Sequence, residues 1–171
     1  MQVIVNAGPL IWLAKVGKLS LLKTFYGQVL IPREVYIETV EKGLKRGFRD
    51  AIIINEACEQ GWIKIVDLNN TQLRLRDKIL SRLKELDKGE VDAIVYAKTT
   101  KADVILLDDS TARAFAESWE IKAKGTLYII LKAYRQGALT KNETKESIVN
   151  LIEKGFRIDP KLLTKITKQI S

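Results

Sequence analysis

The residues best suited to chemistry in this chain are oxygen-bearing side chains near the ends of apolar runs. Asp108 and Asp109 follow one such run, and Asn6 follows another at the start of the chain. Glu38 lies in the segment after a third apolar run, at 28–31. Glu90 precedes the apolar run at 104–107, which Asp108 follows. Carboxylate and amide oxygens bind hard divalent cations, and clusters of them support metal-assisted hydrolysis.

Glu90 and Asp92 are both candidates, but helix geometry separates them. On a predicted helix over 88–100, two residues turn the chain by about 200°, so the two side chains point roughly 160° apart. Glu90 shares its face with small apolar residues and is the better candidate to point inward. Asp87 stands three residues before it, however, and this capping-box spacing makes a simple helix cap the alternative role for Glu90.

The composition restricts which chemistry such a cluster can support. The chain has no histidine and a single cysteine, Cys58, which excludes a Ser-His-Asp triad, His-ligated zinc and an intrachain disulfide. Two carboxylates about 4 Å apart repel by ~4 kcal/mol at an effective dielectric of 20, so a cluster favours a bound cation. Oxygen ligands alone indicate Mg²⁺ or Mn²⁺. The net charge of +8 favours a polyanionic partner such as nucleic acid.

Strands and helices are predicted to alternate along the chain, which is typical of an α/β fold with a mostly parallel sheet. The predicted strands are 2–5, 28–31, 62–66, 104–107 and a short edge strand at 121–124. The predicted helices are two within 9–26, then 32–47, 48–60, 71–86, 88–100, 110–119 and most of 126–170. Ligand sites in such folds lie at the carboxyl ends of the strands, where the acids fall.

The chain has no Pro/Ser-rich linker and no repeat, so we expect one domain over 1–171, with 138–171 as a helical extension. No apolar run approaches the ~20 residues that cross a bilayer. The first residues lack the features of a signal peptide. We therefore expect a cytoplasmic protein without a membrane partner.

Five motifs of the sequence resemble those of PIN-domain proteins of the VapC type, and more closely a PIN-like subgroup common in archaea and bacteria. Three of them are VNAGPLIWLAKVGKLSLLKTFYGQVLIPREVYIE (5–38), LDKGEVDAIVYA (86–97) and LLDDSTAR (106–113). GTLYIILKAYRQG (125–137) and GFRIDPKLL (155–163) extend the similarity nearly to the C-terminus. The resemblance implies a three-layer α/β/α sandwich and an endoribonuclease for single-stranded RNA that uses Mg²⁺ or Mn²⁺. It also implies the toxin of a toxin–antitoxin pair, a small antitoxin partner and a homodimer.

The resemblance also implies the catalytic and metal-binding residues. These are Asn6, Glu38, Glu90 and Asp109, with Asp108 and Asp92 as further candidate metal ligands. Asn6 replaces the usual acid, and Gly8 stands where the subgroup usually has serine. These departures leave two interpretations open, namely an active nuclease and a catalytically weak module that binds RNA or protein.

Three arginines are candidate RNA contacts. Arg74 and Arg76 belong to the basic helix predicted over 71–86, for which a solvated surface is the alternative. Arg113 follows Asp109 by four residues, so it is predicted either to hold a phosphate or to pair with that aspartate.

Overall fold

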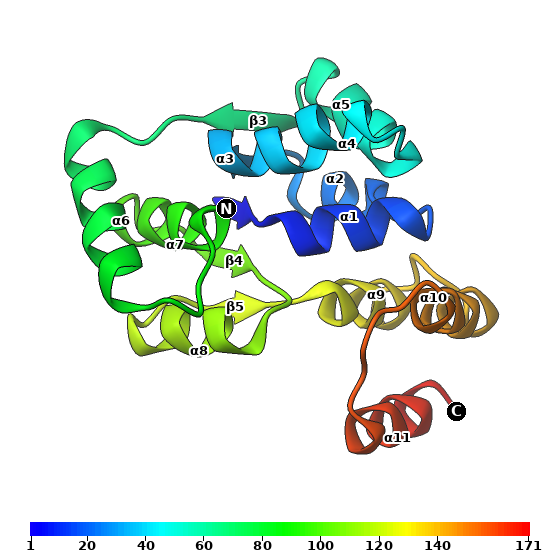
Figure 1. The fold of residues 1–171 in the computed structure, drawn as a ribbon. Helices are drawn as coiled ribbons and strands as arrows, with labels where there is room; N and C mark the ends of the chain where they lie inside the picture. Colours follow the sequence, from blue (N-terminus) through cyan, green and yellow to red (C-terminus); the bar gives the residue numbers. More distant parts are fainter. The chain divides into compact units, whose positions relative to one another are not determined.

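Five short strands form one sheet in the order β3-β2-β1-β4-β5, and every neighbouring pair is parallel. The strands are β1 (Val3–Val5), β2 (Val29–Pro32), β3 (Ile63–Val66), β4 (Val104–Leu106) and β5 (Ala123–Lys124). The central strands β1 and β4 are buried along their whole length, as expected for parallel strands covered on both faces. The predicted α/β fold with a parallel sheet is confirmed in this computed structural model (Figure 1).

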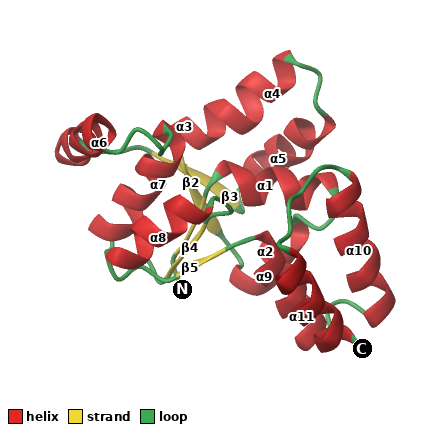
Figure 2. Ribbon diagram, turned by 60° about the horizontal axis from the view of Figure 1, so that its bottom comes forward, coloured by secondary structure: helices red, strands yellow, loops and turns green.

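Helices cover both faces of the sheet. In chain order they are α1 (Ala7–Lys15), α2 (Ser20–Tyr26), α3 (Arg33–Tyr36), the π-helix η1 (Ile37–Glu41), α4 (Lys42–Lys45), α5 (Arg49–Glu59), α6 (Asn70–Arg82), α7 (Lys88–Thr99) and α8 (Ser110–Ser118). Figure 2 shows α1, α2 and α5 on one side of the strands and α6, α7 and α8 on the other. The core includes Val91, Ile94 and Val95 of α7 together with Ile4 and Ile105 of the central strands.

All 171 residues are described, and they divide into two compact units, Met1–Thr126 and Leu127–Ser171. The second unit is helical, with most of α9 (Thr126–Arg135), α10 (Lys141–Glu153) and α11 (Pro160–Ile170). The expectation of one domain with an extension from residue 138 stays a prediction. None of the helices combines the length and the apolar character that a membrane crossing requires.

Residues 32–47 differ from the single helix that the sequence predicts. Pro32 is the last residue of β2 rather than the first of a helix, and helical structure begins at Arg33. The π-helix η1 then interrupts the α-helical stretch. The buried Thr39 Oγ1 donates a hydrogen bond of 2.8 Å to the carbonyl of Val35 within this turn. Single π-turns of this kind occur often at functional sites, and this one carries Glu38.

Candidate active site

Three helices begin at the carboxyl edge of the sheet, and a polar residue stands at each start. Asn6, Asp87 and Asp109 occupy the N-cap positions of α1, α7 and α8. The backbone N–H of Asn6 donates to the carbonyl of Leu106 at 3.0 Å, so the ends of β1 and β4 lie side by side. Helix N-termini carry partial positive charge, which stabilises the carboxylates gathered here.

Asn6 has the position of a helix cap but does not act as one. An asparagine at the N-cap normally accepts a hydrogen bond from the first turn, yet the Asn6 side chain makes no such bond to α1. Its Oδ1 is buried and has no hydrogen-bond partner. Buried acceptors are normally hydrogen-bonded, so this oxygen is available to a ligand.

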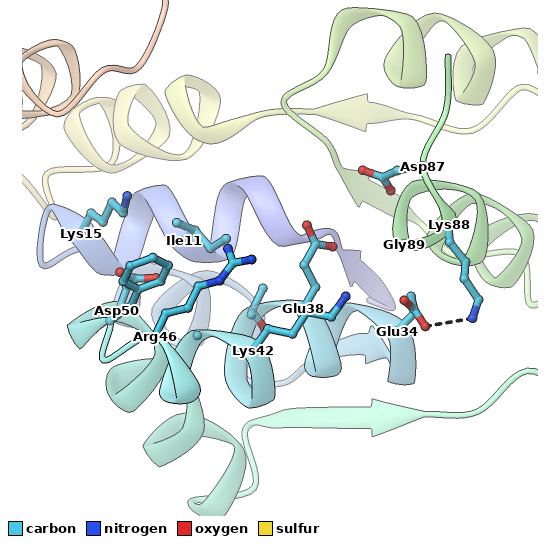
Figure 3. A pocket seen from close by; sticks show the side chains of 13 residues that line it. Ile11, Lys15, Glu34, Glu38, Lys42, Arg46, Asp50, Asp87, Lys88 and Gly89 are labelled. Atoms are coloured by element: carbon cyan, nitrogen blue, oxygen red, sulfur yellow. Dashed lines mark ion pairs between the residues drawn. The ribbon is translucent and has the colours of Figure 1, made fainter. Parts of the chain in front are cut away.

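Oxygens from three segments surround Gly89 of α7. A Cβ built on Gly89 would lie 3.2 Å from Glu38 Oε2, 3.5 Å from Asp87 Oδ1 and 3.6 Å from Asn6 Oδ1. A glycine inside a helix costs roughly 0.5–1 kcal/mol relative to alanine, and here it leaves the space in which these oxygens meet. Figure 3 shows the Glu38 carboxylate extending from its helix toward the side of the pocket that carries Asp87 and Gly89.

Glu90 forms the capping box that its spacing from Asp87 predicts. Asp87 Oδ1 accepts from the Glu90 N–H at 2.8 Å, and Glu90 Oε2 accepts from the Asp87 N–H at 3.0 Å. The second oxygen, Glu90 Oε1, takes part in neither bond. The pKa of Glu90 is raised to about 7, mainly by burial. The hydrogen bond from the Asp87 N–H lowers this pKa, and the charges of Asp87, Asp109 and Glu38 raise it. Capping and membership of the acidic cluster are therefore compatible roles for Glu90.

Glu38 and Asp109 form part of the exposed rim of this cluster, whereas Asn6, Gly89 and Glu90 are buried. Partial burial raises the pKa of Glu38, the charge of Asp87 adds to this, and Lys42 opposes it. Asp109 Oδ1 accepts from the Ala112 N–H at 2.8 Å, so one carboxylate oxygen caps α8 and the other does not. The cluster is thus open to a ligand from solvent.

Asp108 and Asp92 are engaged elsewhere. Asp108 accepts from the N–H of Thr126 at 2.7 Å and from its hydroxyl at 2.6 Å, and so uses both carboxylate oxygens. A Cβ at Gly8 would lie 3.1 Å from Asp108 Oδ2, so the serine typical of the subgroup would crowd this carboxylate. Asp92 lies 3.5 Å from the guanidinium of Arg76.

The three candidate RNA-contacting arginines differ in the hydrogen bonds and ion pairs that their guanidinium groups already make. Arg113 Nη1 donates to the carbonyls of Leu107 at 3.1 Å and Asp108 at 2.5 Å, so it holds the end of β4 rather than the carboxylate of Asp109. Arg76 also bonds Asp77 at 2.8 Å. Arg74 is exposed and takes part in no ion pair of the structure.

The donors present fit a hard divalent cation. No group of three or more Asp, Glu, Cys or His side chains by itself forms a metal cage, but the unpartnered Asn6 oxygen adds a ligand to the carboxylates around Gly89. All of these donors are oxygens, which suits Mg²⁺ or Mn²⁺. The sequence alone indicated a helix-capping role for Asp87 and no role for Gly89. A glycine placed inside a helix between two acids was the available clue to both.

The comparison with protein families identifies the chain. The family model DUF3368, described as a PIN domain, matches residues 2–171. Proteins with this domain are generally nucleases and typically bind divalent metals. No curated protein matches the chain. Because the match covers nearly every residue of both units, the chain belongs to the PIN domain family.

Proposed function

We propose that this protein is an endoribonuclease that depends on Mg²⁺ or Mn²⁺ and hydrolyses phosphodiester bonds of single-stranded RNA. The observation that carries the proposal is the buried, unpartnered Oδ1 of Asn6, which shares the space around Gly89 with carboxylates of Glu38 and Asp87. Membership of a family of nucleases supports the reaction class. The net charge of +8 supports a polyanionic substrate.

In this proposal Asn6, Glu38, Glu90 and Asp109 hold the ion, and Asp87 assists them. When bound, the ion supplies positive charge that polarises a phosphoryl oxygen and lowers the pKa of water. Glu90 lies beside the negative charges of Asp87, Asp109 and Glu38, so a bound cation would relieve the repulsion among these carboxylates. Asp92 and Asp108 are not ligands of the ion in this proposal, because they contact Arg76 and Thr126 instead.

The direct test is cleavage of a single-stranded oligoribonucleotide by the purified protein with Mn²⁺. Glu90→Gln and Asp109→Asn are informative variants because glutamine still completes a capping box and asparagine still caps a helix. We expect both to lower the cleavage rate at least a hundredfold, while Glu117→Gln on the exposed side of α8 leaves it unchanged. Unchanged cleavage by both site variants would show that the site is elsewhere.

We further propose that the protein is the toxin of a toxin–antitoxin pair and forms a homodimer that a small antitoxin inhibits. Support for this comes from the PIN-domain motifs alone. Expression of the wild-type chain should arrest growth, and co-expression of a small protein encoded beside it should relieve the arrest. Growth equal to that of the Asp109→Asn variant would contradict the toxin role.

A catalytically weak RNA- or protein-binding module is the second candidate. It is favoured by the amide at Asn6, and by the fact that no group of three or more Asp, Glu, Cys or His side chains is placed to hold a metal ion by itself. Calorimetry with Mn²⁺ separates the two candidates, because the weak module should show no saturable binding at millimolar metal. Asn6→Asp should then restore binding if one ligand alone is missing.

A further inference from the structure

A groove of about 470 Å³ borders the acidic cluster and extends away from it along η1 and α4. Glu38, Asp87 and Gly89 line it where it meets the cluster, and Lys42 and Arg46 line it beyond Glu38. Figure 3 shows Lys42 beside the Glu38 side chain and Arg46 extending toward Ile11 of α1. The proposed metal site uses neither cation.

One wall of this groove has a regular charge pattern. Glu34, Glu38, Lys42 and Arg46 follow one another at every fourth residue, and all four line the groove. The first three lie in the helical stretch that ends at Lys45, and Arg46 is its C-cap. Four residues of helix rise about 6 Å, so each step separates neighbouring charges by roughly one turn. The wall therefore changes from acidic beside the cluster to basic away from it.

The two cations of this wall are available to a ligand. Lys42 and Arg46 are exposed, and neither takes part in an ion pair of the structure. Glu34, on the same wall, is paired with Lys88 at 3.2 Å. Lys42 lies near enough to Glu38 to oppose the rise in its pKa. An acidic cluster repels a phosphate backbone, and adjacent free cations offset that repulsion.

An exposed aromatic ring completes the groove. Phe48 lines it and is 47% exposed, although burial of such a ring is favourable. A Cβ on Gly43 would lie 4.0 Å from a ring carbon of Phe48 and 2.7 Å from the Cβ of Ala51. The ring thus lies beside a part of α4 that has no side chain. Exposed rings next to free cations are the elements with which proteins bind single-stranded nucleic acid.

We propose that this groove is the subsite for the nucleotide next to the cleaved phosphodiester of a single-stranded nucleic acid. Lys42 and Arg46 contact its phosphate, and its base stacks on Phe48. Stacking accepts any base, so the subsite contributes affinity and position more than sequence preference. The inference rests on the proposed nuclease function, since it takes the acidic cluster as the place of cleavage.

Binding of a labelled single-stranded oligoribonucleotide in EDTA, measured by fluorescence anisotropy, tests the cations without cleavage. We expect Lys42→Gln and Arg46→Gln each to weaken binding about three- to tenfold and to lower the slope of log K against log salt by about one. Lys45→Gln and Arg49→Gln are matched controls, since both residues are exposed, at the end of α4 and the start of α5, but do not line the groove. Equal losses in the controls would overturn the inference.

The base contact has a separate test. Phe48→Ala should weaken binding of the oligoribonucleotide about tenfold, whereas Ile52→Ala, which removes another exposed apolar side chain outside the groove, should leave it unchanged. On a base-free ribose-phosphate chain of the same length, Phe48→Ala should have no effect. An equal loss on both chains would overturn the stacking.

The results of these binding tests can overturn the subsite without overturning the nuclease proposal, and the reverse also holds. Normal binding by the Lys42, Arg46 and Phe48 variants, together with cleavage that requires Glu90, would overturn the subsite alone. Binding that depends on the three groove residues, in a wild-type protein without cleavage under Mn²⁺, would support the groove and overturn the nuclease proposal.

Discussion

At the scale of single residues, the question at position 6 is what an amide does that a carboxylate would not. A carboxylate here would add a negative charge to the space around Gly89 that carboxylate oxygens of Glu38 and Asp87 already share, and like charges repel. In the proposed metal site, the amide would supply a ligand oxygen without that repulsion. The oxygen stays unpartnered in the absence of an ion, and the Asn6 side chain forms no cap to α1.

Substitution of Asn6 should separate stability from metal binding. Asn6→Asp should lower the free energy of unfolding without metal by about 1–3 kcal/mol and tighten Mn²⁺ binding about tenfold. Asn6→Ala should keep the stability within about 1 kcal/mol, because no hydrogen bond of the side chain is lost, and should weaken Mn²⁺ binding. Urea denaturation and calorimetry measure the two quantities. A large loss of stability in Asn6→Ala would show a structural role for the side chain.

Glu90 should give the metal-free protein a defined pH dependence. Its pKa is about 7 in the folded chain against a usual value of 4.5, so between these values the folded state keeps a proton that the unfolded state has lost. The free energy of unfolding should therefore fall as the pH rises from about 4.5 to about 7, by up to about 3 kcal/mol. Urea denaturation in EDTA across this range should show a shallower fall in Glu90→Gln. Identical slopes would contradict the raised pKa.

At the scale of elements, the order of parallel strands and helices explains why these side chains meet. The strands of a parallel sheet all end at the same edge, and a helix that follows a strand begins there. β1 and β4 lead directly into α1 and α8, whose N-cap residues are Asn6 and Asp109, whereas α7 follows α6 and has Asp87 as its N-cap residue. Oxygens of Asn6 and Asp87 both lie near Gly89 of α7. Glu38 reaches the site differently, from inside the helical stretch after β2, at the π-helix η1.

Replacing Gly89 should damage the site without damaging its helix. Alanine is favoured over glycine within a helix by roughly 0.5–1 kcal/mol, so Gly89→Ala should leave thermal stability equal or higher. Its methyl group would lie 3.2 Å from Glu38 Oε2, in the space between the oxygens that we propose as metal ligands. We expect Mn²⁺ affinity to fall about tenfold or more in calorimetry. A variant with normal affinity would show that the ion binds away from Gly89.

The elements were predictable from local patterns, and parts of the site were not. Apolar runs identified the strands, and the spacing of Asp87 and Glu90 predicted the capping box that the structure contains. The π-helix η1 was missed because apolar spacing does not reveal one inserted residue in a turn. The hydrogen bonds of Asp108 to Thr126 and of Arg113 to strand-end carbonyls depend on the packing of distant segments, which no local pattern fixes.

At the scale of the whole molecule, charge is distributed unevenly. The chain carries a net charge of +8, yet acidic side chains gather at the carboxyl edge of the sheet. Such a surface attracts a polyanion over a distance, while the acidic cluster requires a cation before a phosphate can approach closely. Metal binding and RNA binding are thus expected to reinforce each other at this site.

The whole molecule should be stabilised by divalent metal, and the effect should depend on pH. An ion that binds only the folded chain adds about 2.7 kcal/mol at one hundred times its Kd, which corresponds to a rise in Tm of about 5–10 °C for a chain of this size. Protons compete with the ion for Glu90, whose pKa is about 7. Differential scanning fluorimetry with Mn²⁺ should therefore show the full rise at pH 8 and little at pH 5. Glu90→Gln should abolish the rise and Glu117→Gln should retain it, whereas a rise that is equal at both pH values would place the ion at a site without Glu90.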